Sequence, residues 1–278
     1  MGRLVYSELL KTFLKKRTYL GFLIILIIVP LVEVVMKVEG GRYLSMTTRG
    51  LAMDFSILGN PFNGWFVAHS IMNSLWVQIP LLISFVAGDQ LAGEATSGTY
   101  RLILIRPVSR TRVITAKYVV TVIYTVLFVL FLGGLSIGLA LALLGGGDLF
   151  VIGRSIVVLA SSDVAWRFCA AYLLASWGMI SIAAIAFFFS SFVENAIGPI
   201  VATMGVQIVF LIISNIPSQF FDDVKPYLYT TYINVWQKCF MTLVPWDDVW
   251  KSVAALGAYS VGSFLLAWMI FVRKDILS

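Results

Sequence analysis

The chain has 278 residues, of which 60% are hydrophobic and only 12% are charged, and its mean hydropathy is +0.94. These values, together with repeated apolar runs longer than about 18 residues, predict a polytopic membrane protein and leave little room for a soluble domain. The formal net charge of +6 does not predict a nucleic-acid partner, because Lys and Arg gather beside the apolar runs, where they orient membrane helices.

The first 17 residues are predicted to form an amphipathic helix in the membrane interface. Leu9, Phe13 and other apolar residues recur at helical spacing, and the basic residues around the other face are Lys11, Lys15, Lys16 and Arg17. The alternative is a basic tail that only fixes the topology. The apolar run Tyr19–Val32 precedes no small-residue cleavage site, so we expect a retained first span rather than a signal peptide.

Glu33 ends this first apolar run. A carboxylate in the middle of a bilayer costs about 2.5–3.5 kcal/mol. Because Glu33 lies near the end of the predicted span and one helical turn before Lys37, we expect it to be paired or to reach the membrane surface.

The second predicted span carries the only histidine. His69 and Asn73 lie one turn apart on the same helical face, and Gln78 lies about two turns deeper. Such a face can line a polar pathway or make ordinary hydrogen bonds between helices, and we favour the second interpretation. No metal site is predicted, because the two cysteines, Cys169 and Cys239, have no CxxC or Cys/His spacing.

The charged segment Gly88–Lys117 separates the second and third predicted spans. Glu94 is expected on a helix that continues the second span out of the membrane, and Gly98 can end that helix. The run Thr99–Ile105 is apolar although it lies outside the predicted spans. A loop that only anchors the topology gains nothing from such a run, so we expect a short amphipathic helix pressed into another protein.

A new helix is predicted to begin just after this apolar run. Pro107 breaks the run, and Ser109 is placed to cap the helix that becomes the third span. Arg110 and Arg112 then lie in the first helical turn, where the macrodipole disfavours cations by about 0.3–1 kcal/mol each. Their presence there indicates a compensating interaction, with phospholipid headgroups or with an acidic partner.

Two short motifs bear on catalysis. Residues Gly134–Gly138 match the GxSxG pattern of a nucleophile elbow, but they lie within an apolar helix rather than on a strand-to-helix turn. The same residues are better explained as a GxxxG surface on which two helices approach closely. No GxxxxGK[ST] sequence occurs, so the chain has no P-loop for ATP.

Three later apolar runs are longer than a bilayer requires: Tyr118–Gly147, Phe168–Val193 and Asn195–Phe221. A helix of about 27 residues is about 40 Å long, against about 30 Å of hydrocarbon, so part of each run must protrude, break or re-enter. The candidate break points are Pro199, Pro217 and the glycines Gly145, Gly146 and Gly147.

The segment 216–249 is rich in aromatic residues and carboxylates, which suits short helices at the outer membrane surface. By the predicted topology Cys169 and Cys239 also lie toward that side, where a disulfide between them could form.

The whole chain, residues 1–278, is therefore predicted to be a single all-α membrane domain. If the N-terminus is cytoplasmic, Lys and Arg concentrate on that side, so both termini and the charged segment are expected in the cytoplasm. The six predicted spans lie near residues 18–37, 65–87, 117–144, 167–191, 195–216 and 250–272.

The charged segment resembles the signature of ABC-2-type permeases. The shared string is Gly93-Glu94-x-x-x-Gly98-Thr99, then Leu102 and Leu104, then Pro107-Val108-Ser109-Arg110 and Lys117. The branch that it resembles includes the permease of the nitrous-oxide-reductase maturation system, gliding-motility permeases, and antibiotic or sodium exporters. Six spans, an interfacial first helix and a long outer segment before the last span agree with this family over essentially the whole chain.

The resemblance implies a permease subunit, an exporter by family expectation, in a bacterial or archaeal cytoplasmic membrane. Residues from Glu94 to about Arg106 would form a coupling region that docks in a cleft of a separate ATPase. Two ATPase copies would bind ATP and Mg, and a second permease, identical or similar, would complete the transporter. This chain would hold no cofactor and catalyse no reaction. The implied coupling residues are Glu94, Gly98, Thr99, Tyr100, Arg101, Leu102, Arg106 and Arg110.

Two other functions stay open. The same machinery could transmit force to a periplasmic partner without moving a solute. The chain could instead be an intramembrane enzyme, which the lone His69 and the lack of clustered intramembrane carboxylates disfavour. The resemblance carries over no particular substrate, because this branch varies widely in what it transports.

Overall fold

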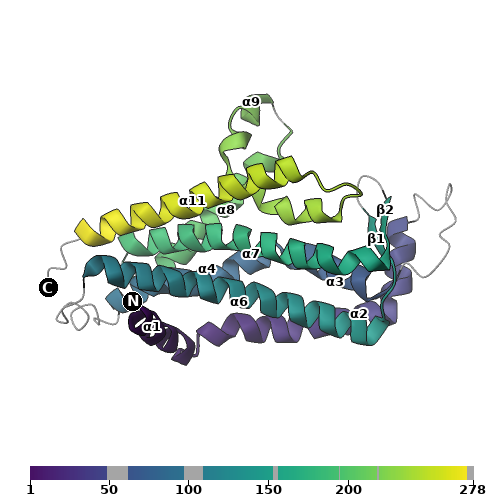
Figure 1. Ribbon diagram of the computed structural model, residues 1–278, viewed down its shortest axis with the longest axis horizontal. Helices are drawn as coiled ribbons and strands as arrows, with labels where there is room; N and C mark the ends of the chain where they lie inside the picture. Colours follow the sequence, from purple (N-terminus) through teal and green to yellow (C-terminus); the bar gives the residue numbers. More distant parts are fainter. Residues whose placement is uncertain (49–61, 97–108, 153–155, 194, 218, 274–278) are drawn as a thin grey trace.

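The computed structural model describes residues 1–48, 62–96, 109–152, 156–193, 195–217 and 219–273. Long helices lie side by side along one axis, with α1 and the end of α11 at the same end of the bundle (Figure 1). The helices are α1 (Gly2–Leu14), α2 (Thr18–Thr48), α3 (Gly64–Leu75), α4 (Gln78–Thr96), α6 (Arg110–Leu144), α7 (Ser161–Phe192), α8 (Ile197–Asn215), α9 (Gln219–Asp222), η1 (Lys225–Tyr227), α10 (Tyr229–Tyr232), η2 (Ile233–Phe240) and α11 (Trp246–Arg273).

Five of these helices are long and apolar enough to cross a membrane, and α3 with α4 passes the same test as a bent pair. The chain is thus a helical, multi-pass membrane protein by the length and composition of its helices. The second span, predicted as one continuous helix, is instead broken by a bend of 57° between Leu75 and Gln78. Pro80 explains the break, because its ring and missing N–H disrupt the helical hydrogen bond to residue 76.

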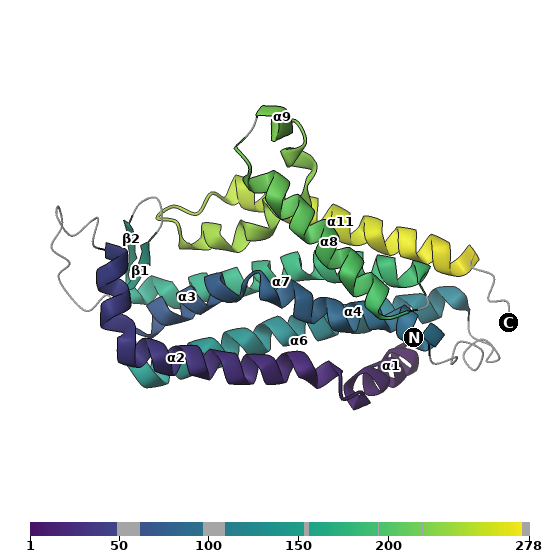
Figure 2. The same cartoon turned by 180° about the vertical axis from the view of Figure 1, so that it is seen from behind.

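Helix α7 forms the centre of the bundle. In its most apolar stretch 72% of the residues are buried, against 17–33% in the other four candidate spans. Its buried residues include a run of small side chains, among them Ala183, Ala184 and Ala186, and small residues let neighbouring helices approach closely. Helix α8 lies on the side of α7 that faces the viewer in Figure 2, and few of its residues are buried.

The long apolar runs end at some of the predicted break points. Helix α6 continues to Leu144 and stops at Gly145, whose φ of 72° is a conformation that glycine adopts readily. Helix α8 ends before Pro217. Pro199 does not break that helix, because it lies in the first turn, where the missing N–H would be unpaired anyway.

A β-hairpin is the part of the fold that the all-α prediction missed. Strands β1 (Leu149–Ile152) and β2 (Ile156–Leu159) pair antiparallel, with Leu149 opposite Leu159. Asn63 ties this end of the bundle together, because its side chain caps α3 at Phe66 N (3.1 Å) and donates to Asp148 O (2.6 Å).

The expected GxxxG packing surface lies one residue away from the observed close contact. A Cβ at Gly134 or Gly138 would meet nothing within 4 Å, whereas one at Gly133 would lie 2.9 Å from the Tyr172 ring. Ser136, the central residue of the GxSxG match, is buried within α6 and lies 3.1 Å from the Tyr172 hydroxyl.

The expectation for Glu33 is wrong. Its side chain is fully buried rather than paired or at the surface. The buried face of α2 runs through Ile25, Val29 and Glu33 and then turns to Gly40, which leaves Lys37 exposed.

Candidate functional site

A cluster of charged side chains joins α1 to the ends of α4 and α6. Helix α1 turns Glu8 and Thr12 inward, where both are buried, and leaves apolar residues such as Leu10 and Leu14 exposed. The inward face of α1 is therefore partly polar. Such a face needs polar partners, since a buried charge is costly unless it is paired.

Lys117, a buried residue of α6, lies at the centre of this cluster. Its Nζ atom lies 2.8 Å from Glu8 Oε2 and 2.7 Å from Glu94 Oε1, and its side chain is only 2% exposed. Lys11 joins the same pair of carboxylates, at 2.6 Å from Glu8 Oε1 and 3.6 Å from Glu94 Oε1. Two carboxylates thus face two ammonium groups, which balances the charge of a largely buried set.

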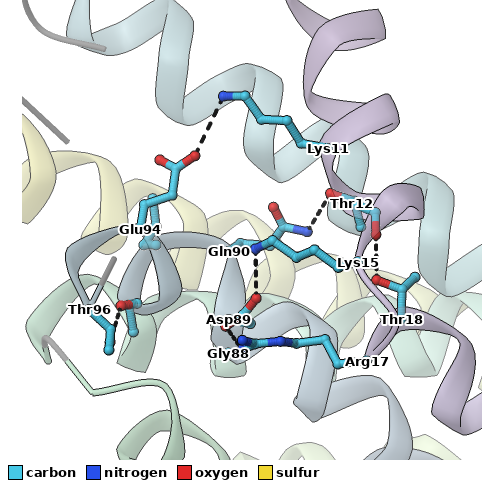
Figure 3. A network of polar contacts seen from close by, with 12 residues as sticks. Lys11, Thr12, Lys15, Arg17, Thr18, Gly88, Asp89, Gln90, Glu94 and Thr96 are labelled. Atoms are coloured by element: carbon cyan, nitrogen blue, oxygen red, sulfur yellow. Dashed lines mark hydrogen bonds and ion pairs between the residues drawn. The ribbon is translucent and has the colours of Figure 1, made fainter. Parts of the chain in front are cut away.

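A second group of ion pairs lies one turn earlier on α4. Asp89 is buried and accepts from Lys15 Nζ at 2.8 Å and from the Arg17 guanidinium. Figure 3 shows Lys15 and Arg17 reaching from the turn between α1 and α2 to this single carboxylate. The basic end of α1, predicted to face lipid headgroups, is therefore paired within the chain at these two positions.

Hydrogen bonds of neutral residues lie between the two charged groups. Gln90 Nε2 lies 3.3 Å from Thr12 Oγ1, and Thr18 donates to the Thr12 carbonyl oxygen (Figure 3). Thr12 and Thr18 are both buried. These contacts fix the angle at which the chain passes from α1 into α2.

The ion pairs determine how Glu8 and Lys11 titrate. Burial alone raises the pKa of Glu8, but the adjacent Lys117 and Lys11 outweigh it and hold the pKa below its usual value. Burial lowers the pKa of Lys11, and its contacts with Glu8 and Glu94 outweigh this effect and raise the pKa. Both groups are therefore stabilised in their charged forms.

The same stretch of α4 is fixed to the central helix. Ser190 of α7 donates to the Gly88 carbonyl at 2.5 Å and accepts from Leu91 N at 3.2 Å and from Ala92 N at 2.9 Å. A movement of the end of α4 is thereby passed to both α1 and α7.

Arg110 shows a different compensation from the one expected. Its guanidinium donates to the Val272 carbonyl oxygen at 3.0 Å, in the last turn of α11. A helix C-terminus favours a cation, so α11 offsets the unfavourable position of Arg110 at the start of α6. Trp268 of α11 also donates to Thr111 at 3.2 Å, which strengthens the same connection.

The predicted coupling residues fall into two groups. Glu94 and Arg110 lie at the two edges of the segment 97–108, where α4 ends and α6 begins. The other six, Gly98, Thr99, Tyr100, Arg101, Leu102 and Arg106, lie outside the described residues. Sequence reasoning missed Lys117 as the partner of Glu94, Glu8 as the second carboxylate on Lys117, and Asp89 as the partner of Lys15 and Arg17. The one local clue was that Glu8 and Thr12 share a face of an otherwise basic helix.

His69, Asn73 and Gln78 do not form one continuous polar face. The Asn73 amide donates to the His69 carbonyl at 3.0 Å and accepts from Gln237 of η2 at 3.2 Å. The His69 ring packs against Phe240, with 4.8 Å between ring centroids. Gln78 is exposed and lies beyond the bend between α3 and α4. These contacts are ordinary hydrogen bonds and ring packing between helices.

The described part of the chain shows how its acidic, histidine and cysteine side chains are distributed. Within it, no three His, Cys, Asp or Glu side chains gather into a metal site. Cys169 is exposed, Cys239 is buried, and both are free thiols. Burial raises the pKa of the Cys239 thiol to about 11, which makes it a poor nucleophile at neutral pH.

Comparison with known proteins gives a family. Over 206 residues the chain is 26% identical to the uncharacterized protein YhcI of Bacillus subtilis (strain 168), a match that covers 70% of this chain and 64% of that relative. The chain therefore spans less than two thirds of the length of this curated relative. A family model described as a protein of unknown function, DUF2705, matches residues 22–277, so the chain belongs to the DUF2705 family.

Proposed function

We propose that the chain is the permease subunit of an ATP-driven ABC transporter, with a separate ATPase subunit that docks on the segment between α4 and α6. The proposal rests on the resemblance of residues 93–117 to ABC-2-type permeases and on one structural observation. The two edges of the segment 97–108 contact three other elements between them, Glu94 contacting α1 and α6 and Arg110 contacting α11.

These ties suit a segment that receives force. Residues 97–108 connect α4 to α6, so a force on them acts on both helices. The contact between Glu94 and Lys117 joins α4 to α6, and Arg110 joins the start of α6 to α11. Ser190 passes the displacement of α4 to the central helix α7. Closure of two ATPases on two such permeases would tilt these helices and open a pathway at the permease interface.

Glu94 acts in this proposal as an internal brace. The alternative role, pairing with a basic group of the ATPase, has less support because Lys117 and Lys11 already contact its carboxylate. The same assignment gives the topology: the end of the bundle that holds α1 and the start of α6 faces the cytoplasm. The bent pair α3–α4 then counts as one of six spans. The direction of transport in this proposal is export.

The first test is co-purification. The tagged chain, extracted gently from its native membrane, is expected to bring down a P-loop ATPase with measurable turnover. Replacement of residues 99–106 by a flexible Gly/Ser stretch should abolish this association while the bundle stays folded. A well-folded chain that purifies without any ATPase would remove the mechanism.

Glu94→Ala is expected to reduce ATPase turnover or transport severalfold and to leave membrane insertion intact. Glu39→Ala is the matched control, because Glu39 forms only an exposed pair with Arg42 at 3.2 Å on α2. Wild-type turnover and transport in the Glu94 variant would contradict the bracing role.

A force-transmitting permease is the second candidate. The segment around α9 projects from the side of the bundle (Figure 1), and its aromatic residues Phe220 and Tyr227 are 81% and 75% exposed. Such a projection could engage a periplasmic partner as well as lipid headgroups. Crosslinking from Phe220 to one large extracytoplasmic protein, without any transported solute, would favour this version.

A further inference from the structure

Glu33 of α2 is a buried carboxylate that the coupling function does not use. Its side chain is 0% exposed, and neither carboxylate oxygen has a hydrogen-bond partner in the described parts of the chain. Its neighbours along the buried face of α2, Ile25 and Val29, are apolar members of the main core. A membrane protein rarely retains such a residue without a role, since an unpaired charge in an apolar interior is strongly disfavoured.

A pair of hydroxyl groups on two other helices is linked to this carboxylate through Tyr172. Tyr172 of α7 interacts electrostatically with Glu33, and its hydroxyl lies 3.1 Å from Ser136 Oγ of α6. Gly133 makes this approach possible, because a Cβ there would lie 2.9 Å from the Tyr172 ring. Three helices thus bring three oxygen-bearing side chains into an otherwise apolar core.

Within the described parts of the chain, no cationic side chain pairs with Glu33. On α2, Lys37 is exposed. On α6, Lys117 is engaged by Glu8 and Glu94. On α3, His69 packs against Phe240, and on α7 the facing titratable group is Tyr172. Since no described cationic side chain balances this carboxylate, we assign the balancing charge to a small ligand.

We propose that Glu33 is the anionic centre of a cation site inside the helix bundle, with Tyr172 and Ser136 as adjacent oxygen donors. A single carboxylate requires a single positive charge, so the ligand is a proton or a monovalent metal ion. The site lies on helices other than α4, and the inference stands whether or not an ATPase binds the chain.

The test is the melting temperature of the purified full chain in detergent, measured from about pH 6 to about pH 9, first without sodium and then in a sodium titration. As the pH rises without sodium, the wild-type chain should lose at least about 4 °C, because the carboxylate is left without a counter-charge. Glu33→Gln keeps the shape of the side chain and removes its charge, so the melting temperature of this variant should not change with pH. Glu39→Gln, on the exposed end of the same helix, should follow the wild type.

The two ligands give different results. Recovery of the wild-type melting temperature by sodium at alkaline pH identifies a metal-ion site, and recovery by acid alone identifies a proton site. Equal pH and sodium responses in the wild type and Glu33→Gln overturn the proposal. If Glu33→Gln does not fold, Tyr172→Phe takes its place. It should move the midpoint of the response by about one pH unit or about tenfold in sodium, and an unchanged midpoint likewise overturns the proposal.

Discussion

Lys117 is the residue on which the charged cluster depends most. It is the buried cation between Glu8 and Glu94, both of which are themselves largely buried. Buried ion pairs add little net stability compared with apolar packing, but removal of one partner leaves an uncompensated charge. The four side chains therefore function as a set in which no single member can be lost without cost.

We expect Lys117→Met to destabilise the protein by about 3–5 kcal/mol, because it removes the buried cation that Glu8 and Glu94 share. The measurement is chemical unfolding in detergent, together with the distance between spin labels at the exposed positions Tyr6 and Val119, which reports whether α1 stays docked. Lys251→Met is the control, since Lys251 is 76% exposed and lies 3.9 Å from its partner; it should change stability by less than about 0.5 kcal/mol. A Lys117 variant as stable as this control would contradict the role of the cluster.

The docking of α1 should be sensitive to acid. Because the pKa of Glu8 is lower in the folded protein than its ordinary value of 4.5, its contribution is complete above that value and is lost as the pH falls through the lowered pKa. The same spin-label distance, followed from neutral pH to below pH 4.5, should lengthen at the acidic end. Glu8→Gln should flatten this dependence, and an unchanged acid transition in that variant would rule Glu8 out as its cause.

At the scale of elements, the helices could be predicted largely from the sequence. Apolar runs located the long helices among the described residues, and Gly145 and Pro217 marked two of their ends. The bend before Pro80 was missed because one proline in a long apolar run fits a kinked helix as well as a broken one. The β-hairpin was missed because two strands of four residues each contribute little against a dominant helical pattern.

The candidate site was only partly predictable. Glu94 and Arg110 stood out because charge interrupts an apolar chain there, but their partners lie far away in the sequence. The contact between Lys117 and Glu8 joins residues 109 positions apart. Nothing in one sequence says which of the basic residues faces inward, since that depends on how α1 packs against α6.

The hydrogen bonds between Ser190 of α7 and the backbone of α4 give a prediction at the element scale. Ser190→Ala should destabilise the protein by about 1–3 kcal/mol, because it removes three hydrogen bonds between α7 and the backbone of α4. Ser7→Ala, which removes only an exposed bond to the Leu4 carbonyl, is the matched control. Equal unfolding midpoints for the two variants would show that α4 is held by packing alone.

At the scale of the whole molecule, we expect the bent pair α3–α4 to cross the membrane once. If it does, Lys16 and Arg112 lie on the same side, and Val158 of the hairpin lies on the other. Single cysteines at these positions, in a chain with Cys169 and Cys239 replaced by Ser, should react with an impermeant maleimide accordingly in sealed vesicles. Labelling of Lys16→Cys and Arg112→Cys from opposite sides would show five spans and place α3–α4 as a re-entrant element.

The long separation between the partners in the charged cluster sets an order on biogenesis. Helix α1 leaves the ribosome first. Asp89 and Glu94 follow only with α4, and Lys117 follows with α6. Glu8 and its neighbouring cations therefore stay in water or among lipid headgroups, without these partners, until the start of α6 has been inserted. This end of the bundle therefore assembles late in synthesis. Until then, the exposed apolar side of α1 provides a surface that can bind the membrane and keep the helix there.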